Sequence, residues 1–290
     1  MPEGDSVYQL AHRLDFMVGK KVLTTQFRVP RYALMDLSGA TVDDLWPYGK
    51  HLFMLLGQHI IHTHLKMEGT WAFHRLGTRW RKPGHTARVV IVIEDQPAPI
   101  EIVGHNLGLV EVFPAAQYNQ RMGYLGPDVL YDDWEEYGRG EAIRRLKAQP
   151  HRAIGAALLD QKNLAGVGNE YRAEICFLAG VHPALPVEEV DVPRIVDLTR
   201  RLMWANKDSP IRVSTGVKKA GESSYVFGRN GRPCRRCGTA IDKDFLGGPD
   251  RGGQVDELER VIWWCPRCQP LPHSEAGTTG WVPQDRQHRR

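Results

Sequence analysis

The chain has 290 residues, of which 42% are hydrophobic and 25% are charged, a composition typical of a soluble globular protein with one large domain or two smaller ones. Its formal net charge of +4 is only mildly basic and does not by itself select a class of partner. No stretch approaches the roughly 18 continuous apolar residues of a transmembrane helix, and the N-terminus lacks the apolar core of a secretory signal. We therefore expect a cytosolic protein.

An amphipathic helix is predicted at residues 7–18, where apolar side chains recur on one helical face. Asp5 or Ser6 can cap its start. Pro2 and Glu3 therefore come just before a helix N-terminus, where backbone amides favour negative charge such as that of a phosphodiester.

The opening tetrapeptide, MPEG, places a proline directly behind the start methionine. Because residue 2 is small, removal of Met1 is expected, and Pro2 would then be the terminal residue. A proline nitrogen inside a chain is a tertiary amide and is unreactive. The nitrogen of a free terminal proline is instead a secondary amine.

Residues 22–113 have a strand-like pattern of short, β-rich runs bounded by turns. Many short strands without intervening helices suggest a sandwich or a barrel. Strands are expected at 22–29, 51–57, 59–65, 70–76, 87–95, 100–105 and 107–113.

After about residue 120 the pattern becomes helical. The glycine-rich stretch 214–233 is expected to be a loop, and the tail from about residue 271 lacks periodicity and is expected to be disordered. Helices are expected at 140–149, 153–161, 169–180 and 192–208.

Four of the five cysteines form two CxxC pairs. Each pair can supply two sulfurs from a tight turn, and two such turns close a tetrahedron around Zn²⁺. Four thiolates leave no position for water, so this zinc would be structural; disulfides or redox-active thiols are the alternative, which a reduced compartment disfavours. The predicted ligands are Cys234, Cys237, Cys265 and Cys268, and the fifth cysteine, Cys176, is expected to be a buried thiol.

The chain around these cysteines is rich in arginine, which suits phosphate binding. A solvated surface is an equally good interpretation of the charge alone. The residues are Arg229, Arg232, Arg235, Arg236, Arg251, Arg260 and Arg267.

A second distinctive stretch, LLDQKNLAGVGNEYRAEICF, covers residues 158–177. Gly166, Gly168 and Asn169 are expected to form turns before a helix that starts near Glu170, with Asn169 as its N-cap. Exposed amides at such a helix start suit a DNA phosphate. An ordinary packing hairpin of two helices is the alternative.

Five motifs occur together in a fixed order: MPEG at the start, YGKHL at 48–52, GVGNEYRAE at 166–174, YVFGRNGRPC at 225–234 and RVIWWCPRCQ at 260–269. The ordered set resembles the formamidopyrimidine-DNA glycosylase/endonuclease VIII family of base-excision repair enzymes. The resemblance extends from residue 1 to about residue 269, and MPEG alone would be a weak signal.

The resemblance implies an α+β fold in which DNA binds between two domains. The N-terminal domain, a helix plus a β-sandwich, would cover residues 1–120. A helical domain with a helix–two-turns–helix segment would cover 121–228, a four-cysteine zinc finger 229–270, and a disordered tail 271–290.

The resemblance also implies a bifunctional glycosylase and abasic-site lyase. Pro2 would attack C1′ of the damaged nucleotide and form an iminium, which permits β- and δ-elimination. Glu3 would protonate the sugar ring oxygen, Lys50 would contact a phosphate and assist β-elimination, and Glu174 would orient the terminal amine through water. From sequence alone, the alternatives are an ordinary helix-start carboxylate for Glu3, a hairpin lysine for Lys50 and a solvated glutamate for Glu174.

The same resemblance assigns DNA contacts. Asn169 and Arg260, with the backbone at Gly168, would hold phosphates beside the lesion. The family also credits the Arg260 position with proton donation in δ-elimination, but a guanidinium is a poor acid and phosphate binding is the better role. Met67, next to Lys66, would fill the gap left by a flipped base; a core methionine is the alternative.

The chain departs from the family pattern at three places. Asp5 and Ser6 stand where many members carry Pro and Glu. The purine-specific branch has an Arg-Arg-Phe stretch where this chain has residues 105–107, His-Asn-Leu, which favours oxidised pyrimidines and abasic sites. The 27 residues of 238–264 separate the cysteine pairs more widely than is usual, and 242–257 is expected to be a loop.

We expect a monomer that acts on damaged DNA, is cytoplasmic and associates with the nucleoid. Two other functions remain open at this stage. One is a glycosylase specific for 8-oxoguanine and formamidopyrimidines, and the other is a non-catalytic, zinc-stabilised DNA-binding protein.

Overall fold

The computed structural model describes residues 2–249 and 255–271. The chain divides into two compact units, unit 1 with residues 1–124 and unit 2 with residues 125–290. The predicted finger at 229–270 belongs to unit 2, and the predicted tail after Leu271 lies outside the described residues.

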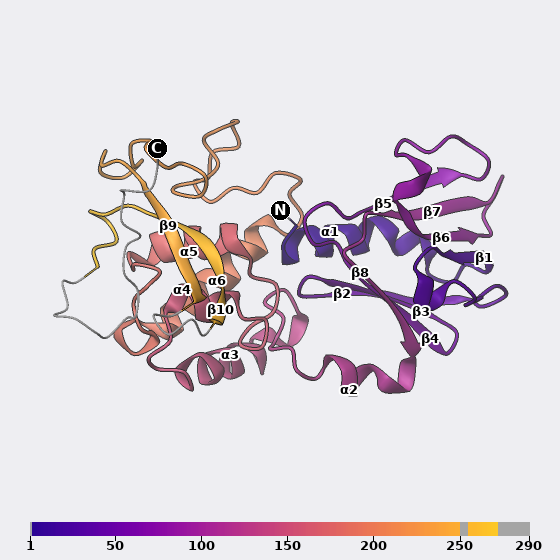
Figure 1. The fold of residues 1–290 in the computed structure, drawn as a ribbon, viewed down its shortest axis with the longest axis horizontal. Helices are drawn as coiled ribbons and strands as arrows, with labels where there is room; N and C mark the ends of the chain where they lie inside the picture. The colour runs from indigo at the N-terminus through magenta and orange to yellow at the C-terminus, as the bar shows by residue number, and fades with distance from the viewer. Residues whose placement is uncertain (1, 250–254, 272–290) are drawn as a thin grey trace. The chain divides into compact units, whose positions relative to one another are not determined.

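Unit 1 contains two four-stranded antiparallel sheets, with the strand orders β1-β6-β7-β5 and β2-β3-β4-β8 (Figure 1). Together with the N-terminal helix they form the predicted helix plus β-sandwich. The helices are α1 (Gly4–Leu14) and α2 (Tyr118–Met122), and the strands are β1 (Val22–Phe27), β2 (Val42–Tyr48), β3 (His51–Leu56), β4 (His59–His64), β5 (Thr70–Arg75), β6 (Ala87–Ile93), β7 (Ile100–His105) and β8 (Leu109–Pro114).

One hydrophobic cluster joins α1 to strands of both sheets. Leu10 and Leu14 of the helix lie in it with Met54 of β3 and Ile91 of β6, all of them buried. This packing explains the apolar periodicity of the first helix, because one face of α1 closes the core.

The start of α1 differs from the prediction. The helix begins at Gly4, and its N-cap is Glu3, whose carbonyl oxygen accepts hydrogen bonds from the amides of Ser6 (3.0 Å) and Val7 (3.2 Å). Asp5, proposed as a cap, instead lies in the first turn, where a carboxylate is favoured by the helix dipole. Strand β2 was not predicted, since VDDLWPY carries two acids and a proline.

Unit 2 packs its longer helices against one another. The helices are α3 (Gly138–Lys147), α4 (Ile154–Leu159), α5 (Asn169–Ala179) and α6 (Val192–Asn206). No helix or strand occurs in 214–233, as predicted. Within the described ranges no helix has the length and apolarity needed to cross a membrane. Short 3-10 helices are η1 (Asp15–Met17), η2 (Pro30–Tyr32), η3 (Gly84–Thr86) and η4 (Ala115–Gln117) in unit 1, and η5 (Asp132–Trp134) and η6 (Val187–Glu189) in unit 2.

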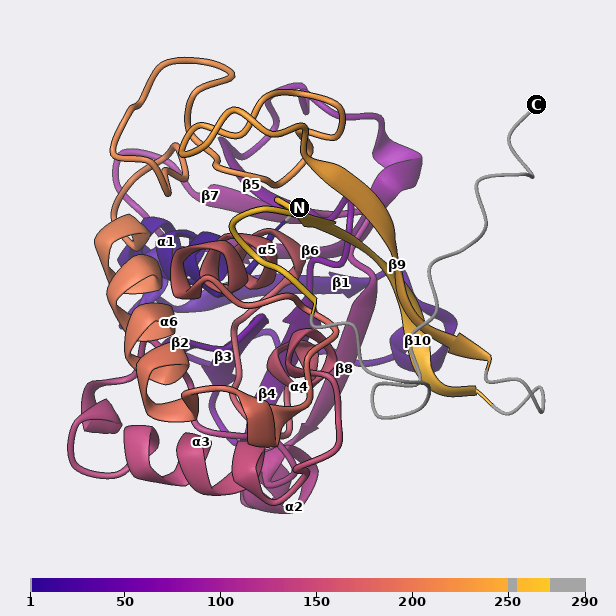
Figure 2. The same ribbon diagram turned by 90° about the vertical axis from the view of Figure 1, so that its left-hand side faces the viewer.

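The segment between the cysteine pairs forms a hairpin of β9 (Asp242–Pro249) and β10 (Val255–Trp264), visible as two paired strands in Figures 1 and 2. The prediction of a loop at 242–257 was therefore wrong for 242–249 and 255–257, while 250–254 lie outside the described residues. Leu246 and Ile262 are buried against Ala156 and Ala184, so apolar residues at the base of the hairpin hold it as a sheet.

Candidate active site

Pro2 and Glu3 lie at the N-terminus of α1. Glu3 is extended, with φ −125° and ψ −170°, and is 0% exposed, whereas Pro2 is only partly buried. The structure therefore places a buried carboxyl group directly after residue 2, at the positive end of a helix dipole.

Lys50 occupies the second position of a two-residue turn between β2 and β3, in which Tyr48 pairs with His51. The first position is Gly49, whose φ of 56° is left-handed, as this class of hairpin turn requires. The YGKHL motif is thus a tight turn that presents one partly exposed lysine.

Met67 lies in the loop between β4 and β5, and it is 67% exposed. The loop is held by the amide of Gly69, which donates to the carbonyl oxygen of Leu65 at 2.9 Å, and by the amide of Lys66, which donates to Nδ1 of His64 at 2.9 Å. Lys66 is itself exposed, with a left-handed φ of 54°. Met67 is therefore not a core residue, and its exposure is compatible with a wedge.

The two turns before α5 are organised by Gln161. Its Nε2 donates to the carbonyl oxygens of Leu159 (2.7 Å) and Val167 (3.0 Å), and its Oε1 accepts from the amide of Gly166 at 3.0 Å. The N-cap of α5 is Gly168 rather than Asn169, which is the first helical residue. The amides at this helix start still form a candidate phosphate site.

The side chain of Asn169 connects α5 to the finger. Its Nδ2 donates to the carbonyl oxygen of Val261 at 3.1 Å, and Nη2 of Arg172 donates to the same oxygen at 2.6 Å and to Oδ1 of Asn169. Arg172 is 1% exposed. Asn169 is thereby fixed beside exposed Arg260, the residue before Val261.

Glu174 is buried inside unit 2 and anchors the loop at 225–227. Its carboxylate accepts hydrogen bonds from the amides of Tyr225 (2.7 Å), Val226 (2.9 Å) and Phe227 (2.9 Å). Burial raises the pKa of Glu174, while these amides and the Ser214 hydroxyl oppose the rise. The side chain is therefore not on a solvated helix face, and it holds part of the YVFGRNGRPC motif in place.

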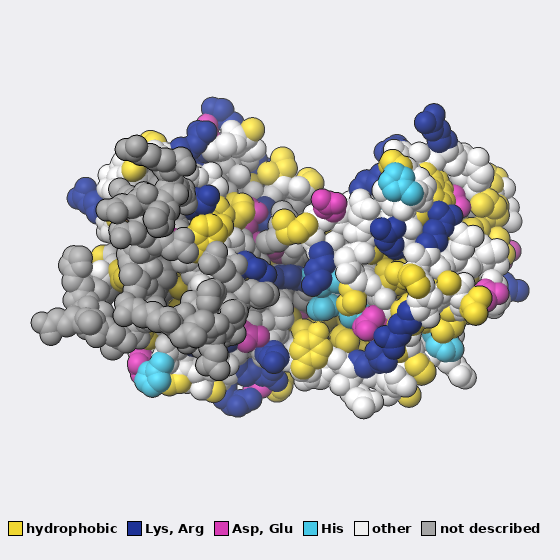
Figure 3. All heavy atoms as spheres, viewed as in Figure 1, with side chains coloured by type: hydrophobic (Ala, Val, Ile, Leu, Met, Phe, Trp, Pro, Cys, Tyr) yellow, Lys and Arg dark blue, Asp and Glu magenta, His cyan; other side chains and the backbone are white. Residues whose placement is uncertain are grey.

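Among the described arginines around the cysteines, Arg229, Arg235 and Arg236 contact other residues of unit 2. Arg229 and Arg235 donate to backbone carbonyls within 221–233, and the guanidinium of Arg236 lies 4.4 Å from the ring centroid of Phe177. On the face in Figure 3, Lys and Arg side chains form several separate groups. Arg232, Arg260 and Arg267 are exposed, and Arg251 lies outside the described residues.

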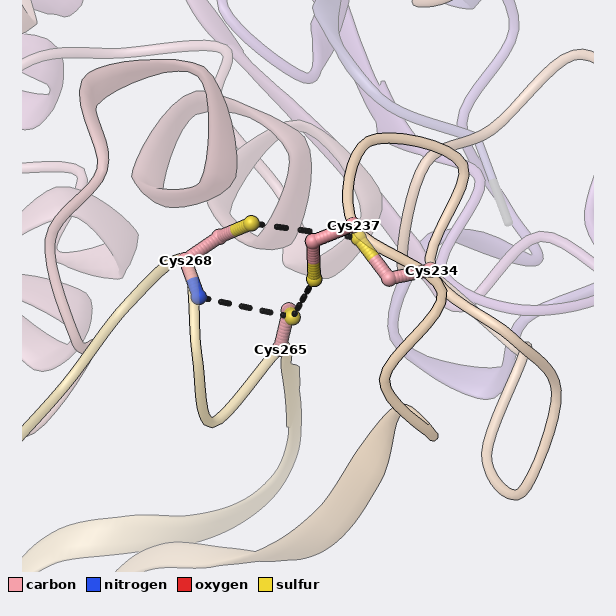
Figure 4. A group of neighbouring side chains, drawn as sticks. All are labelled: Cys234, Cys237, Cys265 and Cys268. Carbon is pink, nitrogen blue, oxygen red and sulfur yellow. Dashed lines mark hydrogen bonds between the residues drawn. The ribbon is translucent and has the colours of Figure 1, made fainter.

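The four cysteines of the CxxC pairs converge, and their sulfurs all lie within 4.8 Å of one another (Figure 4). Cys237 and Cys265 have their Sγ atoms 3.4 Å apart, and Cys234 and Cys268 4.0 Å apart, against about 3.8 Å for a tetrahedron with Zn–S bonds of about 2.3 Å. Backbone amides point at two sulfurs, Arg236 to Cys234 and Cys268 to Cys265, each at 3.4 Å. The cluster can hold a metal ion, and its donors fit zinc.

The fifth cysteine has a different environment. Cys176 is 0% exposed, and burial raises the pKa of its thiol to about 12. The prediction of a buried thiol is confirmed, and this group is unreactive as a nucleophile at neutral pH.

Residues 105–107, matched to the loop that reads the opposite base, do not form an exposed surface. His105 is 0% exposed and Leu107 is 7% exposed, and only Asn106, with a φ of 48°, is partly exposed. Two of the three side chains therefore belong to the interior of unit 1.

Comparisons with known proteins identify the family of this chain. A family model for the formamidopyrimidine-DNA glycosylase N-terminal domain matches residues 1–100, and one for the H2TH domain of the same glycosylase matches residues 125–207. "Probable endonuclease 8 2" of Streptomyces coelicolor is 42% identical, over 98% of this chain and 100% of that protein. The chain belongs to the formamidopyrimidine-DNA glycosylase and endonuclease 8 family.

Two further relatives are informative. "DNA-(apurinic or apyrimidinic site) lyase Nei2" of Mycolicibacterium smegmatis is 44% identical, over 93% of this chain and 99% of that protein. The fold is shared with the Lactococcus lactis formamidopyrimidine-DNA glycosylase bound to DNA with an abasic site, at a TM-score of 0.70 and 21% identity, over 93% of this chain and 100% of that one.

Proposed function

We propose that this protein is a bifunctional DNA glycosylase and abasic-site lyase of base-excision repair. The amine of Pro2, freed by removal of Met1, displaces the damaged base at C1′ and forms an iminium with the sugar. The iminium acidifies the C2′ hydrogens, so that the 3′ phosphate leaves by β-elimination and the 5′ phosphate by δ-elimination. Terminal amines have a pKa near 8, which leaves a useful neutral fraction at physiological pH.

The observation that carries this proposal is the N-terminus of α1, where a buried Glu3 directly follows Pro2. A pure DNA-binding protein has no need of a terminal secondary amine beside a buried acid. Glu3 protonates the ring oxygen, and Lys50 contacts a phosphate beside the lesion and assists β-elimination. Glu174, buried on the amides of 225–227, contributes indirectly by holding that loop.

The DNA-binding role is supported by the hydrogen bonds that Asn169 and Arg172 of α5 donate to the carbonyl oxygen of Val261 in the finger. Asn169, the backbone at Gly168, and Arg260 hold the phosphates that flank the lesion. Met67, with Lys66 beside it, replaces the flipped base in the stack. One structural Zn²⁺ on the four cysteines fixes the finger, and the protein acts as a cytoplasmic, nucleoid-associated monomer.

Oxidised pyrimidines and abasic sites are the proposed substrates. Residues 105–107, two of which are buried, stand where the purine-specific branch of the family has its Arg-Arg-Phe stretch. Relatives named endonuclease 8 are also more similar to this chain than those named formamidopyrimidine-DNA glycosylase. The relatives named endonuclease 8 are 41–42% identical to this chain, against 27–33% for those named formamidopyrimidine-DNA glycosylase.

A panel of otherwise identical oligonucleotides tests the proposal. It contains thymine glycol, 5-hydroxyuracil, 8-oxoguanine opposite cytosine, or an abasic site. We expect nicking of the abasic strand and faster removal of the two pyrimidines than of 8-oxoguanine. Faster removal of 8-oxoguanine would assign the purine-specific function, and binding without nicking of any substrate would assign the non-catalytic one.

A further inference from the structure

A chain of hydrogen bonds crosses three neighbouring strands beside the Lys50 turn. Nδ1 of His51 in β3 lies 2.8 Å from Nε2 of His62 in β4, and Nδ1 of His62 lies 3.1 Å from Oε2 of Glu111 in β8. His51 is 7% exposed and His62 1% exposed. Buried side chains connected in this way have their proton positions fixed by one another.

The proton positions follow from Glu111. An ionised carboxylate only accepts, so Nδ1 of His62 carries a proton and donates to it. A neutral His62 then has a bare Nε2, which accepts from Nδ1 of His51. A neutral His51 consequently has its proton on Nδ1 and an unprotonated Nε2.

The surroundings keep these imidazoles neutral. Burial, helped by electrostatic interactions with His62, His64, Lys50 and Lys66, lowers the pKa of His51 to about 3. For His62, burial also lowers the pKa, while Glu111 opposes the shift. DNA phosphates paired with Lys50 and Lys66 would remove two of the charges that disfavour protonation of His51.

We propose that His51 is the proton acceptor of the lyase step, held with Nε2 unprotonated by the positioning residues His62 and Glu111. The inference rests on the proposed function, which forms an iminium at C1′ but leaves the base for C2′ unassigned. His51, the first residue of β3, directly follows Lys50, the lysine expected to assist β-elimination, and so provides a neutral acceptor next to the turn expected to contact the substrate.

The step balances as follows. The C2′–H bond breaks, and its proton goes to Nε2 of His51. The electron pair of that bond forms C1′=C2′, and the iminium π electrons return to the Pro2 nitrogen as its lone pair. The enamine then expels the 3′ phosphate, and His51 gives its proton to water. Glu111, through His62, stabilises the transient imidazolium without itself taking a proton.

Nitrogen-15 NMR of the imidazole rings tests the tautomers in the free protein without any substrate. We expect protonated Nδ1 and bare Nε2 on both His51 and His62, assigned with His51→Phe and His62→Phe variants. His62→Phe suits this purpose because the His62 ring already stacks on Phe53, with ring centroids 4.7 Å apart. Protonated Nε2 on His51 would overturn the proposal.

Kinetics separate this inference from the proposed function. With abasic DNA, His51→Phe should lower the strand-cleavage kcat on the order of 10²-fold, leave DNA affinity unchanged, and retain the borohydride-trapped adduct, because the iminium forms before the proton is removed. Glu111→Gln should show the same pattern with a smaller loss. His59→Phe, at the other end of β4, and Glu101→Gln, in β7, are the matched controls and should cleave like the wild type.

Cleavage of abasic DNA by His51→Phe at the wild-type rate would contradict the assignment of His51 as the base. An equal loss of trapped adduct and of strand cleavage in this variant would contradict it too. Added imidazole should accelerate cleavage by His51→Ala but not by Glu111→Gln, and the absence of rescue would contradict direct proton transfer. If the wild type itself neither traps nor cleaves abasic DNA, the proposed function fails instead.

Discussion

Asn169, at the start of α5, donates a hydrogen bond of 3.1 Å from Nδ2 to the carbonyl oxygen of Val261, which follows Arg260 in β10. Residues 92 positions apart are thus joined at the two elements expected to hold DNA phosphates. The buried Arg172 binds the same carbonyl and reinforces this contact.

Arg260→Ala should weaken DNA binding and make its salt dependence shallower. Each phosphate contact contributes about 0.9 to the slope of log K against log salt concentration, so the slope should fall by about that amount. Fluorescence anisotropy over a salt series measures it. Arg144→Ala, on α3 and paired with Glu141, is the control, and an unchanged slope for Arg260→Ala would make that arginine an ordinary surface residue.

Met67→Ala should reduce base removal from duplex DNA with little effect on folding, because the side chain is 67% exposed. Met54→Ala should instead destabilise the protein, since Met54 is 0% exposed and truncation of a core methionine lowers the free energy of unfolding by about 2–5 kcal/mol. Thermal melting and single-turnover base release distinguish the two. Base release by Met67→Ala at the wild-type rate would show that Met67 does not fill the gap left by the flipped base.

The finger should contain one zinc per chain, and Cys237→Ser should lose both the metal and DNA binding. Structural zinc contributes directly to folding, so chelation should also increase hydrogen exchange in β9 and β10. Elemental analysis of reduced protein measures the metal. Cys176→Ala is the matched control because Cys176 lies outside the cluster, and it should retain the zinc. Zinc-free wild-type protein would refute the assignment.

Two histidines, the buried His51 and the half-buried His64, should make unit 1 sensitive to acid. The pKa of His51 is lowered to about 3 and that of His64 to about 4, against 6.5 in an unfolded chain. Below pH 6.5 the unfolded state therefore binds protons that the folded state does not, and stability falls with pH by up to about 1.4 kcal/mol per pH unit for each histidine.

Urea unfolding of unit 1, followed by hydrogen exchange at pH 7.5, 6 and 5, measures this slope. His51→Phe should reduce this slope by the contribution of about one histidine. Equal slopes for the wild type and His51→Phe would mean that His51 is protonated in the folded protein.

Sequence patterns located most of the strands because period-two alternation and turn residues are local properties. They failed at β2, because Asp43, Asp44 and Pro47 are residue types that are uncommon in strands. Pairing with β3 stabilises this strand nevertheless. They also failed at β9 and β10, because a glycine-rich stretch is typical of a loop. The burial of Leu246 and Ile262, which stabilises these strands, cannot be predicted from the local sequence.

The four-cysteine cluster and the α5 turns were predictable from spacing, since two CxxC pairs and a glycine-rich helix start are local sequence signals. Arg172, Gln161 and the His51–His62–Glu111 chain were not, because their roles depend on partners from distant segments. A side chain such as Arg172 is unremarkable in sequence and becomes meaningful only when its partner, the Val261 carbonyl, is known.

The central claim is that the nitrogen of Pro2 attacks the sugar, and borohydride trapping on abasic DNA tests it most directly. The wild type should give a covalent protein–DNA adduct, because borohydride reduces the iminium to a stable amine. Pro2→Gly keeps a primary amine and should trap less, while an uncleaved N-terminal extension turns the nitrogen into an amide and should abolish trapping. Lys50→Ala should cleave more slowly and still give some adduct, because a lysine ammonium, with a reference pKa near 10.4, is mostly charged. Trapping by the extended protein together with no trapping by Lys50→Ala would contradict the account and make Lys50 the nucleophile.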